Sequence, residues 1–92
     1  MKINRLDEEF TSRKVKNRVI AKYFGKSEST ISLWRNNKRQ PSLPELREIA
    51  KLLRIDIRDL IEPTDWKKEK SHTYEEFSDK LKYVSIKNSQ KI

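Results

Sequence analysis

Apolar side chains recur at intervals of three and four residues along most of the chain, which is the spacing of one face of an α-helix. Five such stretches precede Pro63, and together they predict an all-α fold in which five short helices form one compact domain. The first helix is expected over about residues 3–13. The apolar positions of the five predicted helices are, in order, Ile3, Leu6 and Phe10; Val19, Ile20 and Phe24; Ile31 and Trp34; Leu46, Ile49, Ala50 and Leu53; and Ile57, Leu60 and Ile61.

The stretch from Lys16 to Arg39 predicts two short helices joined by a tight turn. Gly25, the only glycine in the chain, follows the last apolar position of the first helix, where helices commonly end in a residue with positive φ. Ser27 can then accept a hydrogen bond from the exposed N–H groups of the next helix. The small side chain of Ala21 allows the two helices to cross closely.

Polar residues and prolines predict where the last two helices of this domain begin and end. Ser42 and Glu45 have the spacing of a capping box, and Pro44 fits the first turn, where its missing N–H costs nothing. Asp56 is expected to cap the short fifth helix, and Pro63 to end it.

The composition shifts at Thr64, so we predict a domain over residues 1–63 and a second segment over residues 64–92. Trp66 precedes a charged linker and could fold back on the domain. Thr73 and Glu76 could form another capping box, and a sixth, amphipathic helix is expected over about residues 73–84, with a frayed tail from Ser85. Its apolar face could pack on its own domain or against a second copy of the chain, and the sequence leaves both open. That face consists of Tyr74, Phe77, Leu81 and Val84.

The positive charge of the chain is concentrated in one region. The chain carries a net charge of +8, and residues 13–39 hold nine basic residues and a single acidic one, Glu28, so this region alone matches the net charge of the whole. A cluster of this kind on a pair of short helices is expected of a partner that neutralises phosphates. The nine are Arg13, Lys14, Lys16, Arg18, Lys22, Lys26, Arg35, Lys38 and Arg39.

The residues that most enzymes and metal sites require are scarce. There is no cysteine, and the single histidine, His72, can form neither a metal site nor a nucleophile–base pair alone. We therefore expect no enzyme activity, no metal, no cofactor and no small-molecule substrate. The N-terminus lacks an apolar core of signal-peptide length, and no apolar run approaches the length of a membrane span, so a soluble, cytoplasmic protein with no membrane association is expected.

Four segments over about residues 3–63 resemble the lambda-repressor-like, or Xre/Cro-type, helix-turn-helix regulators: IAKYFG, SESTISLWRNN, KRQPSLPEL and IAKLLRIDIRDLIEP. Three positions depart from the pattern of that family. Lys26 stands in the turn where an apolar residue is usual, and its stem can cover the turn while its amine stays in water. Arg35 stands where glutamate is frequent and adds charge. Asn37 replaces a usual glycine, and asparagine tolerates positive φ.

The resemblance implies a small transcriptional regulator, a repressor by expectation and a homodimer, which binds double-stranded DNA through a recognition helix over about residues 28–36 in the major groove. Asn17 occupies a position where the family often has a glutamine that contacts the DNA backbone, although a simple capping role is the alternative. The residues expected to contact bases are Ser27, Glu28, Ser29, Ser32 and Leu33. Those expected at phosphates are Asn17, Arg35, Asn36, Lys38 and Arg39.

A second hypothesis belongs to another class of function. The same fold could serve as a protein-interaction module, such as an antitoxin, which binds a partner protein through Leu33, Trp34 or the apolar face between Tyr74 and Val84. The two hypotheses differ in whether binding depends on the basic residues.

Overall fold

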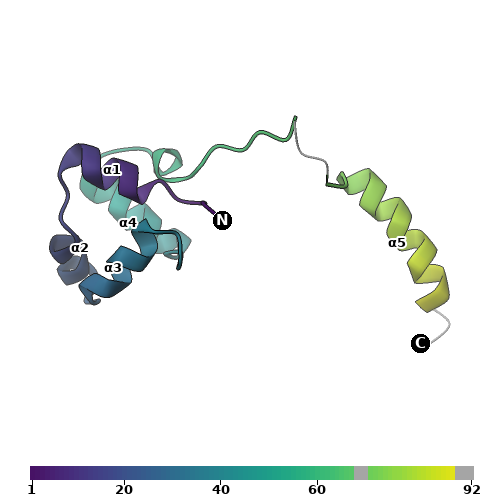
Figure 1. The fold of residues 1–92 in the computed structure, drawn as a ribbon, viewed down its shortest axis with the longest axis horizontal. Helices are drawn as coiled ribbons and strands as arrows, with labels where there is room; N and C mark the ends of the chain where they lie inside the picture. Colours follow the sequence, from purple (N-terminus) through teal and green to yellow (C-terminus); the bar gives the residue numbers. More distant parts are fainter. Residues whose placement is uncertain (68–70, 89–92) are drawn as a thin grey trace.

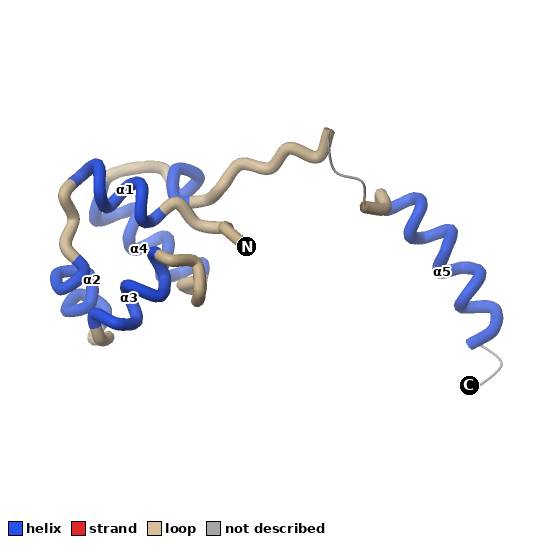
Figure 2. The backbone as a smooth tube through the Cα atoms, in the orientation of Figure 1, coloured by secondary structure: helices blue, strands red, loops and turns tan. Residues whose placement is uncertain are grey.

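A computed structural model of the chain describes residues 1–67 and 71–88. It confirms the predicted all-α fold: a helical domain is followed by a connecting segment and a final helix (Figures 1 and 2). The described residues form no strand, only one isolated antiparallel bridge, between Asn4 and Ile61. The elements are α1 (Leu6–Arg13), α2 (Asn17–Phe24), α3 (Glu28–Arg35), α4 (Leu43–Leu53), the 3-10 helix η1 (Ile57–Leu60) and α5 (Tyr74–Asn88).

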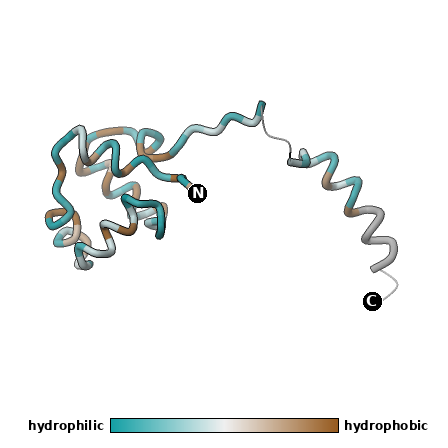
Figure 3. Tube along the Cα trace, in the orientation of Figure 1, coloured by the Kyte–Doolittle hydropathy of each residue, from teal (hydrophilic) through white to brown (hydrophobic). Residues whose placement is uncertain are grey.

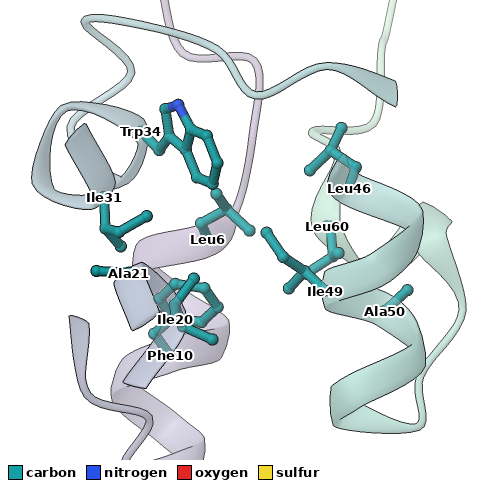
Figure 4. Packing of buried hydrophobic residues seen from close by; sticks show 10 residues of the cluster. All are labelled: Leu6, Phe10, Ile20, Ala21, Ile31, Trp34, Leu46, Ile49, Ala50 and Leu60. Carbon is teal, nitrogen blue, oxygen red and sulfur yellow. The ribbon is translucent and has the colours of Figure 1, made fainter. Parts of the chain in front are cut away.

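One apolar cluster holds α1 to η1 together, and we call these elements the helical domain (Figure 4). Trp34 is the largest buried side chain, and the ring of Phe24 meets it edge-on with centroids 5.7 Å apart. Fully burying a side chain the size of leucine or phenylalanine stabilises a fold by about 1.5–3 kcal/mol. The buried residues are Leu6, Phe10, Ile20, Ala21, Ile31, Trp34, Leu46, Ile49, Ala50 and Leu60.

The first helix is shorter than predicted. It begins at Leu6, because the residues before it pair with the segment that follows η1, where Asn4 and Ile61 form an antiparallel bridge. The N–H of Arg5 donates to the carbonyl of Leu60 at 2.8 Å, and the N–H of Glu62 donates to the carbonyl of Ile3 at 2.7 Å. Ile3 is therefore exposed rather than on an inner helix face, and Ile61 lies beyond the end of η1.

Val19 is a second correction to the predicted core. Its side chain is 57% exposed, whereas Ile20 and Ala21 are buried and Phe24 is partly buried against the core. Adjacent residues on a helix lie about 100° apart, so a stripe that included both Val19 and Ile20 was wider than the surface that the other helices cover.

The predicted caps of α2, α3, α4 and η1 are confirmed, but Pro63 does not end the fifth helix. That helix, η1, already ends at Leu60, because Ile61 is extended and pairs with Asn4. Gly25 ends α2 with φ 64°, and the Ser27 hydroxyl accepts a hydrogen bond from the N–H of Thr30 at 3.1 Å. Ser42 and Glu45 form both hydrogen bonds of the capping box at the start of α4. The Asp56 side chain accepts from the N–H of Arg58 at the start of η1.

The final helix exists and extends further than predicted, to Asn88 rather than about residue 84. The Thr73 hydroxyl accepts from the N–H of Glu76 at 3.3 Å, which is one half of the expected capping box. The connecting segment is largely hydrophilic (Figure 3). Trp66, within this segment, is 68% exposed, so the expectation that it folds back on the domain was wrong. The tail predicted to fray from Ser85 is helical as far as Asn88, and residues 89–92 lie outside the described part.

The apolar face of α5 is not covered by the helical domain. Figure 1 shows α5 standing apart from it, and Tyr74, Phe77 and Leu81 are exposed. The side chain of Val84, the fourth predicted member of this face, lies outside the described residues. Across the described part of the chain, no helix has the length and apolar character needed to cross a membrane.

Candidate functional site

Helices α2 and α3 form a pair in which α3 is anchored by one face only. Ile31 and Trp34 point into the core and are almost completely buried, so the opposite face of α3 is turned outward. Three residues, Gly25 to Ser27, connect the two helices, and the left-handed conformation of Gly25 makes this short turn possible. The pair therefore presents the first turn of α3 at the surface of the domain.

The five residues expected to contact bases lie on or next to this outer face, but they are not equally free. Glu28 and Ser29 are exposed in the first turn, and Glu28 forms no ion pair with a described residue. Ser32 and Leu33 are partly buried. Ser27 is exposed, but its hydroxyl caps α3 and also lies 3.0 Å from the Thr30 hydroxyl.

The loop after α3 carries a second group of predicted residues. The backbone N–H groups of Lys38 and Arg39 donate to the carbonyl of Leu33 at 3.0 and 3.2 Å, which folds the loop back onto the last turn of the helix. The side chains of Lys38 and Arg39 are exposed, as is Asn36 at the C-terminal end of α3. These three residues thus extend the outer face of α3 with polar and positively charged groups.

Lys26, in the turn, stays partly exposed, as expected, and also forms an ion pair. The amine lies 3.5 Å from a carboxylate oxygen of Glu45, and the side chain is 39% exposed. Burial raises the pKa of Glu45, but hydrogen bonds from the Ser42 N–H and hydroxyl, together with the Lys26 charge, outweigh it and hold that pKa below its ordinary value. Lys26 thus connects the helix pair to α4.

Arg35 has a more enclosed position than a free surface cation. Its side chain is 19% exposed and pairs with Asp7 of α1, with a nitrogen–oxygen distance of 2.7 Å. It also donates to the Asn17 amide oxygen at 2.9 Å and to the Thr11 hydroxyl at 3.0 Å, and it lies over the ring of Phe10. We call these five residues the Arg35 cluster. The sequence analysis named two of them, Arg35 and Asn17, as phosphate-contacting residues, but it did not predict the hydrogen bond between them.

A network around Asn37 was also missed from the sequence. Asn37 has φ 58°, as expected, but its side-chain oxygen additionally accepts from the N–H groups of Ile3 and Asn4 at 2.7 and 2.8 Å. Asn4 is 1% exposed and donates to the carbonyl of Trp34 and to Gln40. This network joins the N-terminal segment to the end of α3. No local pattern signals it, because Asn4 and Asn37 are far apart in the sequence.

Six of the nine basic residues in the region 13–39 remain without an ion pair to any described residue. The three ion pairs are Arg13 with Glu9, Lys26 with Glu45, and Arg35 with Asp7. The unpaired residues are Lys14, Lys16, Arg18, Lys22, Lys38 and Arg39, all exposed. Two of them precede α2, two lie within it and two follow α3. The positive charge is therefore concentrated on and next to the helix pair.

Trp34 and His72 are the two remaining side chains that the sequence singled out. Trp34 is 2% exposed, so the expectation that it could contact a protein partner was wrong, because the core already covers it. His72 lies 3.3 Å from a carboxylate oxygen of Glu76 on the exposed surface, and the described residues contain no cluster of potential metal ligands.

Comparisons with known proteins agree with this geometry. A helix-turn-helix family profile matches residues 9–60. Among solved structures, a crystal structure of a candidate DNA-binding protein from Bacteroides fragilis is 45% identical in sequence and superposes with a TM-score of 0.63. The match covers 67% of this chain and 100% of that one. No curated protein matches the chain.

Proposed function

Because the chain belongs to the Xre or lambda-repressor-like family of helix-turn-helix proteins, we propose that it is a small transcriptional regulator, a repressor, which binds specific sequences in double-stranded DNA. The observation that carries the proposal is the exposed first turn of α3, accompanied by basic residues that form no ion pair with a described residue. We assign the protein to the cytoplasm and give it no catalytic role.

We assign α3 to the major groove. A helix with its side chains is about 10–12 Å across and the groove is about 12 Å wide, so one helix fits when its outer face is free. Glu28 can accept a hydrogen bond from cytosine N4, and Ser29 can serve either as donor or as acceptor. Leu33 can contact a thymine methyl group through its exposed part. Ser32 lies beside it, while Ser27 retains its capping bond and can contribute only its remaining hydrogen-bonding capacity.

We assign a positioning role on the DNA backbone to the residues on either side of α3. Lys38 and Arg39 are charged and exposed, and Asn36 lies between them and the helix. Asn17 is the first residue of α2, where backbone N–H groups without a side-chain cap favour an anion. Contacts of this kind fix the register of the protein on DNA and supply affinity without reading sequence.

We further propose that the regulator acts as a homodimer, with α5 as the contact between copies. The exposed apolar side chains of Tyr74, Phe77 and Leu81 support this, since an isolated helix of this kind gains stability when its apolar face is covered. Two copies would then bind two inverted half-sites about one helical turn apart.

Selection of binding sites from a randomised duplex pool at near-physiological salt tests the proposal. We expect enrichment of two inverted half-sites, which would establish a dimeric, specific regulator and set the distance between the two copies of α3. Enrichment of a single short site would retain DNA recognition and contradict the dimer. Failure to enrich any sequence, with binding that disappears as salt rises, would contradict specific recognition.

A protein-interaction module, such as an antitoxin, is the second candidate, and the uncovered face of α5 is the observation that favours it. A protein docked on α5 would not depend on Lys38 and Arg39. Under this alternative, replacing both with alanine leaves binding of the partner intact, whereas DNA binding requires them.

A further inference from the structure

The Arg35 cluster lies where α1, α2 and α3 meet, beside the proposed DNA-binding face. We infer that Arg35 is a positioning residue, which holds the Asn17 side chain in the orientation that a phosphate contact requires, and that it is not itself a phosphate ligand. This inference rests on the proposed function, and it revises the role that the sequence suggested for Arg35.

The hydrogen-bonding chemistry of the two side chains fixes the orientation of Asn17. An arginine guanidinium carries donors only, whereas an asparagine amide has one acceptor oxygen and an NH₂ group with two donors. The Arg35 Nη1 lies 2.9 Å from the Asn17 oxygen, and only the oxygen can accept there. The NH₂ group is consequently directed away from Arg35. It donates to no described residue, so Asn17 offers two donors to a partner from outside the chain.

The other contacts of Arg35 explain why we do not assign it a phosphate. Its Nε and Nη2 atoms both lie within 3 Å of one Asp7 carboxylate oxygen, at 2.9 and 2.7 Å, so a carboxylate already neutralises its charge. Nη2 also donates to the Thr11 hydroxyl. The guanidinium carbon lies 5.5 Å from the centre of the Phe10 ring, which covers one of its faces. A phosphate would have to displace Asp7 to gain the same contact.

A thermodynamic cycle on DNA affinity tests this assignment, with Asn17→Ala, Arg35→Lys and the double variant measured on the duplex enriched by site selection. Lysine keeps the positive charge opposite Asp7 but lacks the planar fork that reaches Asn17 and Thr11 together. We expect Asn17→Ala to weaken binding about tenfold, as loss of a hydrogen bond to a charged group does. Arg35→Lys should weaken binding by a smaller factor, and the double variant should bind no more weakly than Asn17→Ala.

Lys38→Ala is the matched control, because Lys38 is an exposed cation at the same end of α3 without a described ion pair. Its effect should multiply with that of Arg35→Lys, and it should lower the slope of log affinity against log salt by about 1. Asn17→Ala removes no charge and Arg35→Lys keeps the positive charge, so neither substitution should change that slope. Thermal unfolding of each free variant verifies that all are folded at the assay temperature.

The outcomes separate the inference from the function on which it rests. If Arg35→Lys weakens binding equally with and without Asn17, Arg35 acts independently of Asn17 and the inference is overturned. It is also overturned if Asn17→Ala has no effect, or if Arg35→Lys has none while Asn17→Ala does. If the wild-type chain enriches no duplex at all, the proposed function fails before the cycle is measured.

Discussion

At the scale of single residues, the polar side chains form two groups, those exposed to a partner and those that form hydrogen bonds within the domain. Glu28 and Arg39 are exposed and form no ion pair with described residues, so they are available to a partner. Asn4 and Asn37 are used within the domain. The sequence could predict the first group, because such residues are recognised by their charge and by their position on the polar face of a helix or in a loop. It could not predict the second, because those contacts depend on how distant segments meet.

Glu28 and Arg39 should respond differently to substitution. Arg39→Ala should weaken binding to every duplex and lower the salt slope by about 1, because one phosphate contact is lost. Glu28→Ala should instead alter the preference at a single base position, by about 1–3 kcal/mol of discrimination. Titrations of both variants against the selected site and its single-base variants, at several salt concentrations, measure this. Equal losses on all sequences for both variants would contradict the division between base and phosphate contacts.

Asn37 should be more important for stability than its loop position suggests. Asn37→Gly keeps the positive φ accessible but leaves the N–H groups of Ile3 and Asn4 without their acceptor, so we expect a loss of about 1–3 kcal/mol in the free energy of unfolding. Arg54→Gly is the control, since Arg54 has the same φ of 58° and its side chain forms no hydrogen bond or ion pair with a described residue. Chemical denaturation should show Arg54→Gly as stable as wild type or more so.

At the scale of elements, the sequence predicted best what neighbouring residues determine. The ends of α2, α3 and α4 depend on residues within four positions of one another, so Gly25, Ser27 and Ser42 were correctly interpreted. The start of α1 depends on a backbone pairing with residues near position 61, which no local pattern contains. The left-handed ends of α1 and α4, at Lys14 and Arg54, were likewise not signalled by a glycine or asparagine.

The capping box of α4 should make stability depend on pH. The folded-state pKa of Glu45 lies below its ordinary value of 4.5, so its stabilising contribution is complete above about pH 4.5 and is lost as pH falls through the folded-state value. Glu45→Gln retains a capping side chain but removes the charge. The melting temperature of wild type should therefore exceed that of Glu45→Gln at neutral pH, and the difference should shrink in acid. Glu28→Gln, which removes a carboxylate without an ion pair to a described residue, serves as the control, and a difference that stayed constant in acid would contradict the argument.

At the scale of the whole molecule, the helical domain and α5 are separated by a hydrophilic segment (Figures 1 and 3). Among the residues whose burial the structure describes, the buried apolar core lies within the helical domain. From the sequence, we expected a boundary at Thr64 and an amphipathic helix over about residues 73–84. The sequence could not predict what covers the apolar face of α5. The spacing of apolar residues identifies which face of a helix is apolar, but not what packs against that face.

Substitution of the α5 face should separate assembly from folding. Phe77→Glu with Leu81→Glu should convert a dimer to a monomer in analytical ultracentrifugation, because two charges would lie in the proposed apolar contact. The melting temperature of the helical domain should not change, since its core does not include these residues. Lys80→Glu, a neighbouring charge change outside that apolar face, should leave the dimer intact. A wild-type chain that is already monomeric at micromolar concentration would contradict the dimer.

The backbone pairing that displaced the start of α1 also determines how the domain transmits force. Residues 3–5 run antiparallel to residues 60–62, so the two chain ends leave the domain side by side. Tension between the N-terminus and α5, as when a bound regulator is pulled by a partner on its tail, would load these hydrogen bonds one after another, beginning with the bond between Glu62 and Ile3. The pairing would therefore open from its outer end, and further tension would reach Asn37 and the end of α3 through the hydrogen bonds of Asn4.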